Sequence, residues 1–425
     1  MSFRFDPLSD SICEDPYPLY RQLRDEAPVH WSPEARLYCI SRYDDVLATL
    51  KDTETFSSAA MLTVLTRAIE VPITPRHVLM LLRFLLKTRL NPLRFPKAGS
   101  MISFDPPRHE VVRKIVSRGF TPRSVAAWQP RVQSLVDELI AGIADQPRFD
   151  LVEEFAVPLP TTLIAEVLGI EPERRNDFKR WTNALLGLAS GKPIAVLIDS
   201  GLTESIGELY AFIREQVRER RGRPQDDLIS ILVDPKLGEV LDEVDVIQFV
   251  CLLLVAGNET TTNLIGNAVC ALLDRPDQVE LALGEPACIP NLVEEAVRFD
   301  SPVQMVFRTA TRDVEVAGTT IPRGAEVACM LASANRDERQ FENPDVFDAT
   351  RDTTGHLGFG FGVHFCLGAS LARLEAGTAL AGLIPMLQSF ERSGRASEPL
   401  NSILVRGRTL IELSAKKSEP VAPSP

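Results

Sequence analysis

The sequence lacks the features that mark several large classes of protein. Its seven cysteines (positions 13, 39, 251, 270, 288, 329 and 366) are scattered, odd in number and include no Cys-x-x-Cys pair. This usage argues against a disulfide framework and a zinc site, and it fits a reducing compartment. The net charge of −12 argues against general nucleic-acid binding.

A targeting signal and long hydrophobic runs are also missing. The N-terminus, Met1–Asp6, has no apolar signal region. The longest apolar runs, Val246–Ala256 and Val78–Leu86, are too short to span a bilayer. We therefore expect a soluble, cytoplasmic chain without a transmembrane anchor, and a monomer is the default oligomeric state.

What is present is an ordinary globular composition, 45% hydrophobic and 24% charged over 425 residues. Amphipathic periodicity over residues 105–290 predicts successive helices, and no linker of domain-boundary length interrupts residues 290–370. We predict a mainly α fold with small β parts near residues 30–60, 301–330 and 400–414, as one domain over residues 1–415 with a disordered tail at 416–425. The predicted helices are Tyr43–Lys51, Pro106–Arg118, Val125–Ala144, Thr161–Leu168, Glu173–Leu188, Thr203–Arg221, Asp242–Asp274 and Leu292–Phe299.

The most informative segment is a glycine-rich, nearly uncharged loop, Phe359-Gly-Phe-Gly-Val-His-Phe-Cys366-Leu-Gly368. It holds one cysteine directly before a helical pattern over residues 369–381. A helix N-terminus just after Cys366 would favour the ionised sulfur. The alternative is a buried free cysteine, which is a common core residue.

The helix predicted over Asp242–Asp274 would be about 50 Å long, and its nearly all-apolar first half should cross the core. Its middle, Ala256-Gly-Asn-Glu-Thr-Thr-Thr262, is a poor helix sequence because glycine and three threonines lower helix propensity. Threonine hydroxyls can also bond back to carbonyls and bend the axis. This segment is either a satisfied polar network or a distorted turn that leaves space beside a ligand.

Together the two segments resemble the cytochrome P-450 family. The pattern Phe-x-x-Gly-x-x-x-Cys-x-Gly is similar to that family's haem-binding loop, and Ala256–Thr261 matches its oxygen-activation motif, including Gly257. The resemblance implies the cytochrome P-450 fold and a haem b (iron protoporphyrin IX) cofactor with the Cys366 thiolate as axial ligand. It also implies that Thr260 hydrogen-bonds oxygen at the iron while Glu259 delivers protons through water.

The resemblance implies further haem contacts. His109 and Arg113 lie at i and i+4 on a helix that Asp105 should cap, and they match a family pair that holds the haem propionates. An isolated His/Arg pair is more often a surface feature. Arg308 and His364 match the remaining propionate contacts.

Residues around the sulfur have implied roles too. Phe359 would shield the sulfur, and backbone N–H groups near Leu367 and Gly368 could bond it. Gly362 would allow the loop to turn tightly.

The pair Glu295-x-x-Arg298 is a weak signal by itself. The same spacing occurs at Glu110/Arg113, Glu171/Arg174 and Glu215/Arg218, and most such pairs are solvated and contribute only about 0.3–0.5 kcal/mol. In the family it is a buried structural pair that holds the cysteine loop. The usual third member, an arginine in Pro-x-Arg-Phe, is absent from Pro344–Phe347, so Arg351 is the substitute candidate.

The implied substrate is a small hydrophobic molecule. The pocket candidates, which plain core packing would use equally well, are Leu185, Leu188, Val255, Ala256, Val303, Met305, Val306 and Leu404. Residues 61–97 are leucine-rich and carry seven Lys/Arg against one acid. In the family this region covers the substrate pocket, so the resemblance implies a lid here. Its composition fits an amphipathic lid with a solvated basic face, a lid that binds a substrate carboxylate, or a face that rests on an anionic membrane.

The implied reaction inserts one oxygen atom of O₂ into a C–H or C=C bond of a fatty acid, terpenoid, steroid or polyketide-like molecule. Electrons would come from NAD(P)H through a separate ferredoxin-type partner and its reductase. Candidates for docking that partner are Lys114, Arg118, Arg123 and Arg373, although a solvated surface is the more common role for each residue individually. A peroxide-driven peroxygenase and a non-enzymatic haem-thiolate sensor are the alternatives, and the pair Glu259/Thr260 disfavours both.

Overall fold

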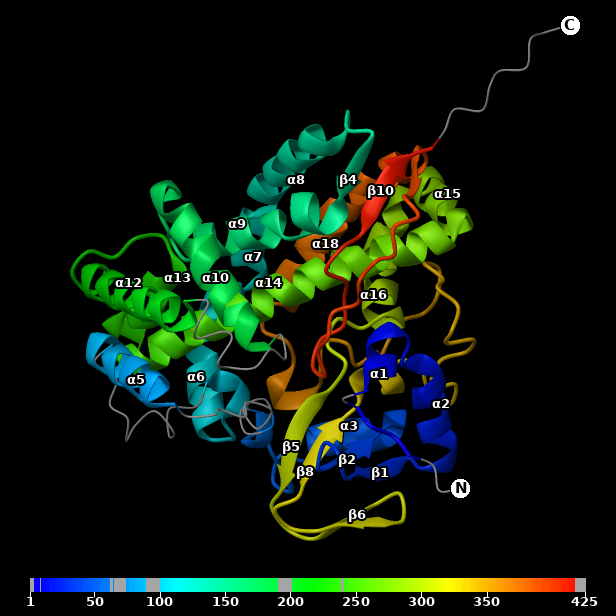
Figure 1. The fold of residues 1–425 in the computed structure, drawn as a ribbon, viewed down its shortest axis with the longest axis horizontal. Coiled ribbons are helices and arrows are strands. Elements are labelled where there is room, and N and C mark those ends of the chain that lie inside the picture. The colour runs from blue at the N-terminus through cyan, green and yellow to red at the C-terminus, as the bar shows by residue number, and fades with distance from the viewer. Residues whose placement is uncertain are drawn as a thin grey trace, which may run out of the picture.

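The computed structural model describes residues 4–7, 9–61, 64, 74–88, 100–189, 201–237 and 241–416. Within these ranges the chain is mostly helical with three small β-sheets, as Figure 1 shows. The predicted mainly α fold class is confirmed. The division into one domain and a tail stays a prediction.

The helices occupy most of the described chain. They are α1 (Asp10–Glu14), α2 (Tyr17–Glu26), α3 (Tyr43–Lys51), α5 (Pro75–Thr88), α6 (Arg108–Val116), α7 (Pro122–Ala127), α8 (Gln129–Ile143), α9 (Pro158–Val167), α10 (Arg175–Ala189), α12 (Leu202–Gly222), α13 (Leu228–Val233), α14 (Glu243–Asp274), α15 (Pro276–Gly284), α16 (Ile289–Phe299), α17 (Leu331–Ala334) and α18 (Ala369–Leu387).

The strands form one larger and two smaller sheets. The first has the order β1-β2-β8-β5-β3, the second β4-β10-β9 and the third β6-β7. Their bounds are β1 (Val29–Ser32), β2 (Leu37–Ile40), β3 (Phe56–Ser57), β4 (Arg148–Asp150), β5 (Val306–Ala310), β6 (Val314–Val316), β7 (Thr319–Ile321), β8 (Glu326–Cys329), β9 (Phe390–Arg392) and β10 (Glu412–Ala415).

Helix α14 runs through the middle of the molecule, with α8, α9 and α18 on one side and the larger sheet with α2 and α3 on the other (Figure 1). It starts where the sequence predicts, because the Asp242 carboxylate accepts the Asp245 N–H at 2.8 Å and caps the helix. Within the described residues it is the one helix long and apolar enough to cross a membrane. Its contacts with α9, α10, α16 and α18 are those of a central core helix.

Two predicted elements differ from the structure. The helix predicted over Val125–Ala144 is split at Trp128, because Pro130 has no N–H to donate to the Ala126 carbonyl one turn earlier. The strand predicted near 402–414 is formed only as β10, from Glu412 onward. Before β10, the backbone makes single hydrogen bonds to the segment around residues 302–304 in place of a continuous strand ladder. The Leu404 carbonyl accepts from the Gln304 N–H, and the Arg406 N–H donates to the Pro302 carbonyl.

Helix α2 lies in a segment that its prolines mark as turns. It nevertheless begins directly after Pro16 and keeps Pro18 in its first turn, where a missing N–H costs nothing. The predicted helices do not include α2, because prolines are more common in turns than inside helices and only their place in the first turn makes them compatible with one.

Candidate active site

The cysteine loop lies between Leu357 and the start of α18. The Cys366 N–H donates to the Phe359 carbonyl at 2.9 Å and closes the loop. Gly362 has φ +71°, and a Cβ there would lie 3.1 Å from the Leu50 carbonyl oxygen. The predicted tight turn at Gly362 is therefore confirmed, and glycine is required there by conformation and by space.

The surroundings of Cys366 act on its thiol in opposite directions. Burial raises its pKa, whereas the N–H groups of Gly368 and Ala369 and the charges of Arg113 and Arg373 lower it. The expected N–H donor at Gly368 is present, and the second donor is Ala369 at the first position of α18 rather than Leu367. Burial outweighs these effects, including the expected effect of the helix N-terminus, so the net shift of the Cys366 pKa is upward and the thiol is not ionised by the protein alone.

Basic side chains gather beside this loop. The rings of His109 and His364 lie 4.1 Å apart between centroids, and the Arg113 guanidinium donates to the Phe365 carbonyl at 2.6 Å. Arg308 is buried and donates to the carbonyl of its own neighbour, Phe307, at 2.8 Å. Burial, and then the nearby cations, lower the pKa of His364 to about 3. Asp105 and Glu110 lie close enough to act on this cluster, but neither Arg113 nor Arg308 forms an ion pair within the described residues, so both guanidinium groups could bind a group that carries carboxylates.

His109 is the most telling member of the cluster. Its side chain is fully buried, and neither ring nitrogen has a hydrogen-bond partner within the described residues. Burial, and then Arg113, lower its pKa. Such an orphaned imidazole is unfavourable unless a bound group supplies the missing hydrogen bond.

Asp105 does not cap α6 as predicted. The helix begins at Arg108 after Pro107, without a side-chain cap. The Asp105 carboxylate instead accepts from the Ser57 hydroxyl at 2.5 Å and the Ser58 N–H at 2.7 Å. It thereby links β3 to the start of α6, which a local helix-capping pattern could not predict because the serines are distant in the sequence.

The middle of α14 borders an accessible space. Ala256 is exposed and Gly257, Glu259 and Thr260 are half-buried, whereas the helix is buried from Thr261 to Leu272. The Thr260 hydroxyl donates to the Ala256 carbonyl at 2.6 Å, which is the back-bond expected of threonine. The helix is nevertheless continuous, so the predicted distorted turn does not interrupt it.

Gly257 and Glu259 differ in what surrounds them. A Cβ on Gly257 would lie 2.5 Å from the Ile164 Cδ1 of α9, so this glycine permits close helix packing. Burial raises the pKa of the Glu259 carboxyl to about 7, so it is half protonated near neutral pH.

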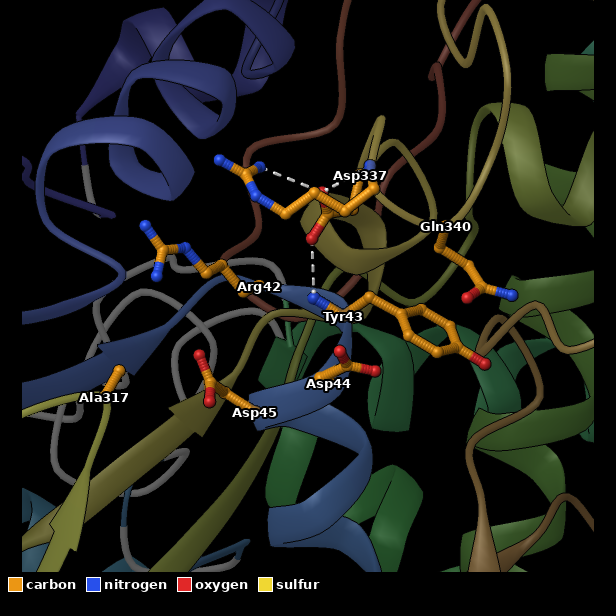
Figure 2. Close-up of a pocket in the computed structure, with 8 residues that line it drawn as sticks. Arg42, Tyr43, Asp44, Asp45, Ala317, Asp337 and Gln340 are labelled. Carbon is orange, nitrogen blue, oxygen red and sulfur yellow. Dashed lines mark hydrogen bonds and ion pairs between the residues drawn. The ribbon is translucent and has the colours of Figure 1, made fainter.

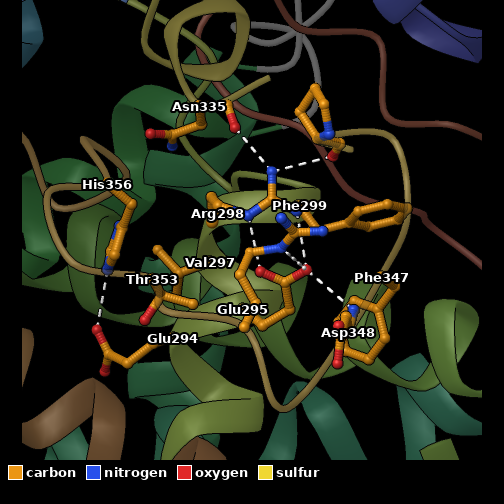
Figure 3. A network of polar contacts seen from close by, with 12 residues as sticks. Glu294, Glu295, Val297, Arg298, Phe299, Asn335, Phe347, Asp348, Thr353 and His356 are labelled. Carbon is orange, nitrogen blue, oxygen red and sulfur yellow. Dashed lines mark hydrogen bonds and ion pairs between the residues drawn. The ribbon is translucent and has the colours of Figure 1, made fainter. Parts of the chain in front are cut away.

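Glu295 and Arg298 form a fully buried bidentate pair, at 2.7 and 2.8 Å (Figure 3). Arg298 also donates to the Asn335 and Pro344 carbonyls, at 2.8 and 3.0 Å. Arg351 completes the network, with its Nε 3.2 Å from Glu295 Oε1. The Asn335 side chain accepts the Leu357 N–H at 2.6 Å, which links the pair to the start of the cysteine loop.

The pocket candidates occupy different environments. Leu185 and Met305 are buried in the core, whereas Val255, Val303, Val306 and Leu404 are half-buried. The Leu188 side chain lies outside the described residues, as does most of the predicted lid over 61–97. The lid's described helix, α5, exposes Val78, Leu79 and Leu82 beside Arg83.

A separate cavity of about 340 Å³ lies at the start of α3 (Figure 2). Carboxylates and guanidinium groups line it, including Asp44, Asp45, Asp337 and Arg339, so it does not suit an apolar substrate. Asp337 already has a structural role there, because its carboxylate accepts the Tyr43 N–H at 2.9 Å and caps α3.

Of the four docking candidates, Arg373 forms a bidentate ion pair with Glu294 of α16, so part of its charge is compensated. Its role in docking stays a prediction. Lys114 and Arg123 are exposed, and Arg118 is half-buried. The sequence reading missed Glu294 because its spacing from Arg373, 79 residues, carries no periodic signal.

Comparison with known proteins agrees with a haem-thiolate site on this fold. The cytochrome P450 family model matches residues 288–407. The chain is 36% identical to cytochrome P450 107B1 of Saccharopolyspora erythraea over 415 residues, 94% of this chain and 95% of that one. It is also 36% identical to the cyclomarin C epoxidase CymV of Salinispora arenicola over 375 residues, 88% of this chain and 89% of that one.

Solved structures agree as well. Cytochrome P450 CYP109Q5 from Chondromyces apiculatus superposes with a TM-score of 0.83 at 37% identity, covering 98% of this chain and 99% of that one. The chain belongs to the cytochrome P450 family. It is a monooxygenase whose cofactor is haem with a cysteine thiolate as axial ligand, and the family uses O₂, small hydrophobic substrates and redox partners.

Proposed function

We propose that Cys366 is the axial ligand of the haem and that His109, Arg113 and Arg308 hold the haem propionates. The observation that carries this proposal is the orphaned, fully buried His109 beside the cysteine loop. His364 belongs to the same cluster, and its Nε2 bonds the Ser58 hydroxyl at 2.9 Å. When bound, the haem supplies the binding and reductive activation of O₂.

We assign the movement of protons to α14. Glu259 holds a proton up to about pH 7 and can pass it to water beside the helix. The Thr260 hydroxyl donates its proton to the Ala256 carbonyl. Its oxygen can therefore still accept a hydrogen bond from a water, and the hydroxyl can instead rotate toward the substrate side. The small, exposed side chain of Ala256 leaves space for water on this side of the helix.

For the substrate we propose a lipophilic molecule that is hydroxylated or epoxidised. The apolar pocket candidates support this, together with two relatives: the vitamin D(3) 25-hydroxylase of Pseudonocardia autotrophica, 35% identical, and P450BioI, solved with an acyl carrier protein that bears hexadec-9Z-enoic acid, 30% identical. The basic residues of α5 favour a fatty acid over a neutral terpenoid, steroid or polyketide-like substrate.

The remaining parts of the proposal concern the setting of the reaction. Electrons come from NAD(P)H through a ferredoxin-type partner and its reductase, with Lys114 and Arg123 on the docking face. We place the enzyme in the cytoplasm as a monomer of one domain over residues 1–415.

A titration followed by visible spectroscopy tests the proposal. Medium- and long-chain fatty acids, their matched alcohols and several steroids are added to the purified protein. A shift of the Soret band that reports conversion of the haem iron from low to high spin, when seen with the acids, supports a carboxylate-binding lid. A shift with neutral compounds alone contradicts the fatty-acid assignment, and no haem band after reconstitution overturns the haem proposal.

Replacing Thr260 by alanine is expected to uncouple electron use from product formation. Product per NAD(P)H should fall several-fold while NAD(P)H consumption continues, because the alcohol that positions protons is lost. Thr378→Ala is the matched control, since Thr378 on α18 makes the same back-bond, to Leu374 at 2.8 Å. An unchanged yield in Thr260→Ala would show that Thr260 has no such role.

The pH dependence of coupling is expected to follow Glu259. Its carboxyl pKa is raised by burial to about 7, so the proton-donating form prevails below pH 7 and is lost above it. Product per NAD(P)H should therefore decline as the pH rises through 7. In Glu259→Gln this inflection should be absent, and its persistence would assign the titration to another group.

A further inference from the structure

The aromatic ring of Phe359, at the start of the cysteine loop, is held by two side chains from different parts of the chain. The Arg373 guanidinium of α18 lies 4.4 Å from its ring centroid, and the His356 ring lies 5.8 Å from it. The Phe359 carbonyl in turn accepts the Cys366 N–H at 2.9 Å. The position of this ring and that of the cysteine are therefore coupled.

One carboxylate fixes both of these neighbours. Glu294 of α16 accepts from Arg373 Nε and Nη2, at 2.5 and 2.9 Å. Figure 3 shows its other contact, with His356 Nε2 at 2.9 Å. Burial raises the pKa of Glu294, but hydrogen bonds from Arg373 and His356 outweigh burial and bring the pKa down to about 2. Glu294 is thus a carboxylate at neutral pH.

The tautomer of His356 follows from its neighbours. The Gly358 N–H donates to His356 Nδ1 at 3.2 Å, so Nδ1 is the acceptor. Nε2 then carries the proton and donates it to Glu294. Both edges of the ring are bonded, and its orientation against Phe359 is fixed.

Arg373 has an electrostatic connection to the sulfur as well. Arg373 lies on α18, seven residues after Cys366, and its guanidinium lies over the ring of Phe359, whose carbonyl accepts the Cys366 N–H, so its charge is held near the sulfur. A cation beside a ligating thiolate withdraws electron density from the metal and favours its reduced state. Glu294 offsets part of that charge.

We propose that Glu294, His356 and Arg373 are positioning residues that hold Phe359 beside Cys366 and set the reduction potential of the haem iron. This inference rests on the proposed role of Cys366 as the haem ligand. It gives two adjacent glutamates different roles. Glu295 supports the backbone before the loop through Arg298, whereas Glu294 acts on the aromatic ring and the charge next to the sulfur.

The midpoint reduction potential of the purified holoenzyme, measured by spectroelectrochemistry, tests this inference. Arg373→Met removes a cation near the sulfur and is expected to lower the potential. Glu294→Gln leaves that cation uncompensated and is expected to raise it. Arg373→Lys keeps the charge and should restore a potential close to that of the unsubstituted enzyme.

Arg131→Met is the matched control, because Arg131 forms an equally bidentate pair with Glu166, at 2.8 and 2.8 Å, between α8 and α9. Its potential should not change. Opposite shifts in Arg373→Met and Glu294→Gln support the inference, whereas unchanged potentials or shifts of the same sign overturn it. If Arg373→Met does not retain haem, Arg373→Gln is compared with Arg373→Lys on the same criterion. A missing Soret band in the unsubstituted protein would overturn the proposed function instead.

Discussion

Replacing Cys366 by alanine is expected to abolish monooxygenase activity and the red-shifted Soret band of the ferrous–CO complex. Both depend on a thiolate donating to the haem iron, and an alanine methyl group cannot replace it. The fold should survive, because the loop is closed by the Cys366 backbone N–H and by the turn at Gly362, neither of which needs the sulfur. Absorption spectra, activity and circular dichroism of the variant check these three expectations.

The control for this substitution is Cys251→Ala. Cys251 is also a partly buried free cysteine, but it lies on α14 away from the cysteine loop, and its replacement should leave the spectrum unchanged. Cys366→His is expected to retain haem with a histidine-type spectrum. A red-shifted ferrous–CO band that persists in Cys366→Ala would show that another residue ligates the iron.

Local patterns made much of the fold predictable from the sequence. The start of α14 is fixed by Asp242, whose capping carboxylate acts within three residues. The back-bond of Thr260 likewise depends on a neighbour within one helical turn, and the positive φ of Gly362 is a local turn conformation, although the close approach of the Leu50 carbonyl there is not local. Such short-range geometry follows from residue type alone.

Contacts between distant segments were not predictable in the same way. Asp105 has the sequence context of a helix cap, yet its carboxylate bonds two serines of the β3 region that are 47 and 48 residues away. Arg373 reads as a surface cation until the fold places Glu294 beside it. Position along the chain carries no information about these partners, since they are chosen by tertiary packing.

Removing one member of the buried pair Glu295–Arg298 is expected to destabilise the protein far more than breaking an exposed ion pair. Both side chains are fully buried, so Arg298→Ala would leave the Glu295 carboxylate without its main partner. Breaking one side of a buried pair typically costs about 3–5 kcal/mol. Urea unfolding of Arg298→Ala should show a loss of this size, together with weakened haem binding through Asn335 and Leu357.

A matched pair and a double substitution separate the causes. Arg174→Ala breaks a pair of the same spacing, Arg174–Asp177, whose side chains are 44% and 36% exposed, and should cost less than about 1 kcal/mol. The double variant Glu295→Leu with Arg298→Met removes both charges, so it should be less destabilised than Arg298→Ala. It should not reach the stability of the unsubstituted protein, because the Asn335 and Pro344 carbonyls and the Asp348 N–H lose their partners. A double variant as unstable as Arg298→Ala would show that these backbone bonds, rather than the buried charge, hold the cysteine loop in place.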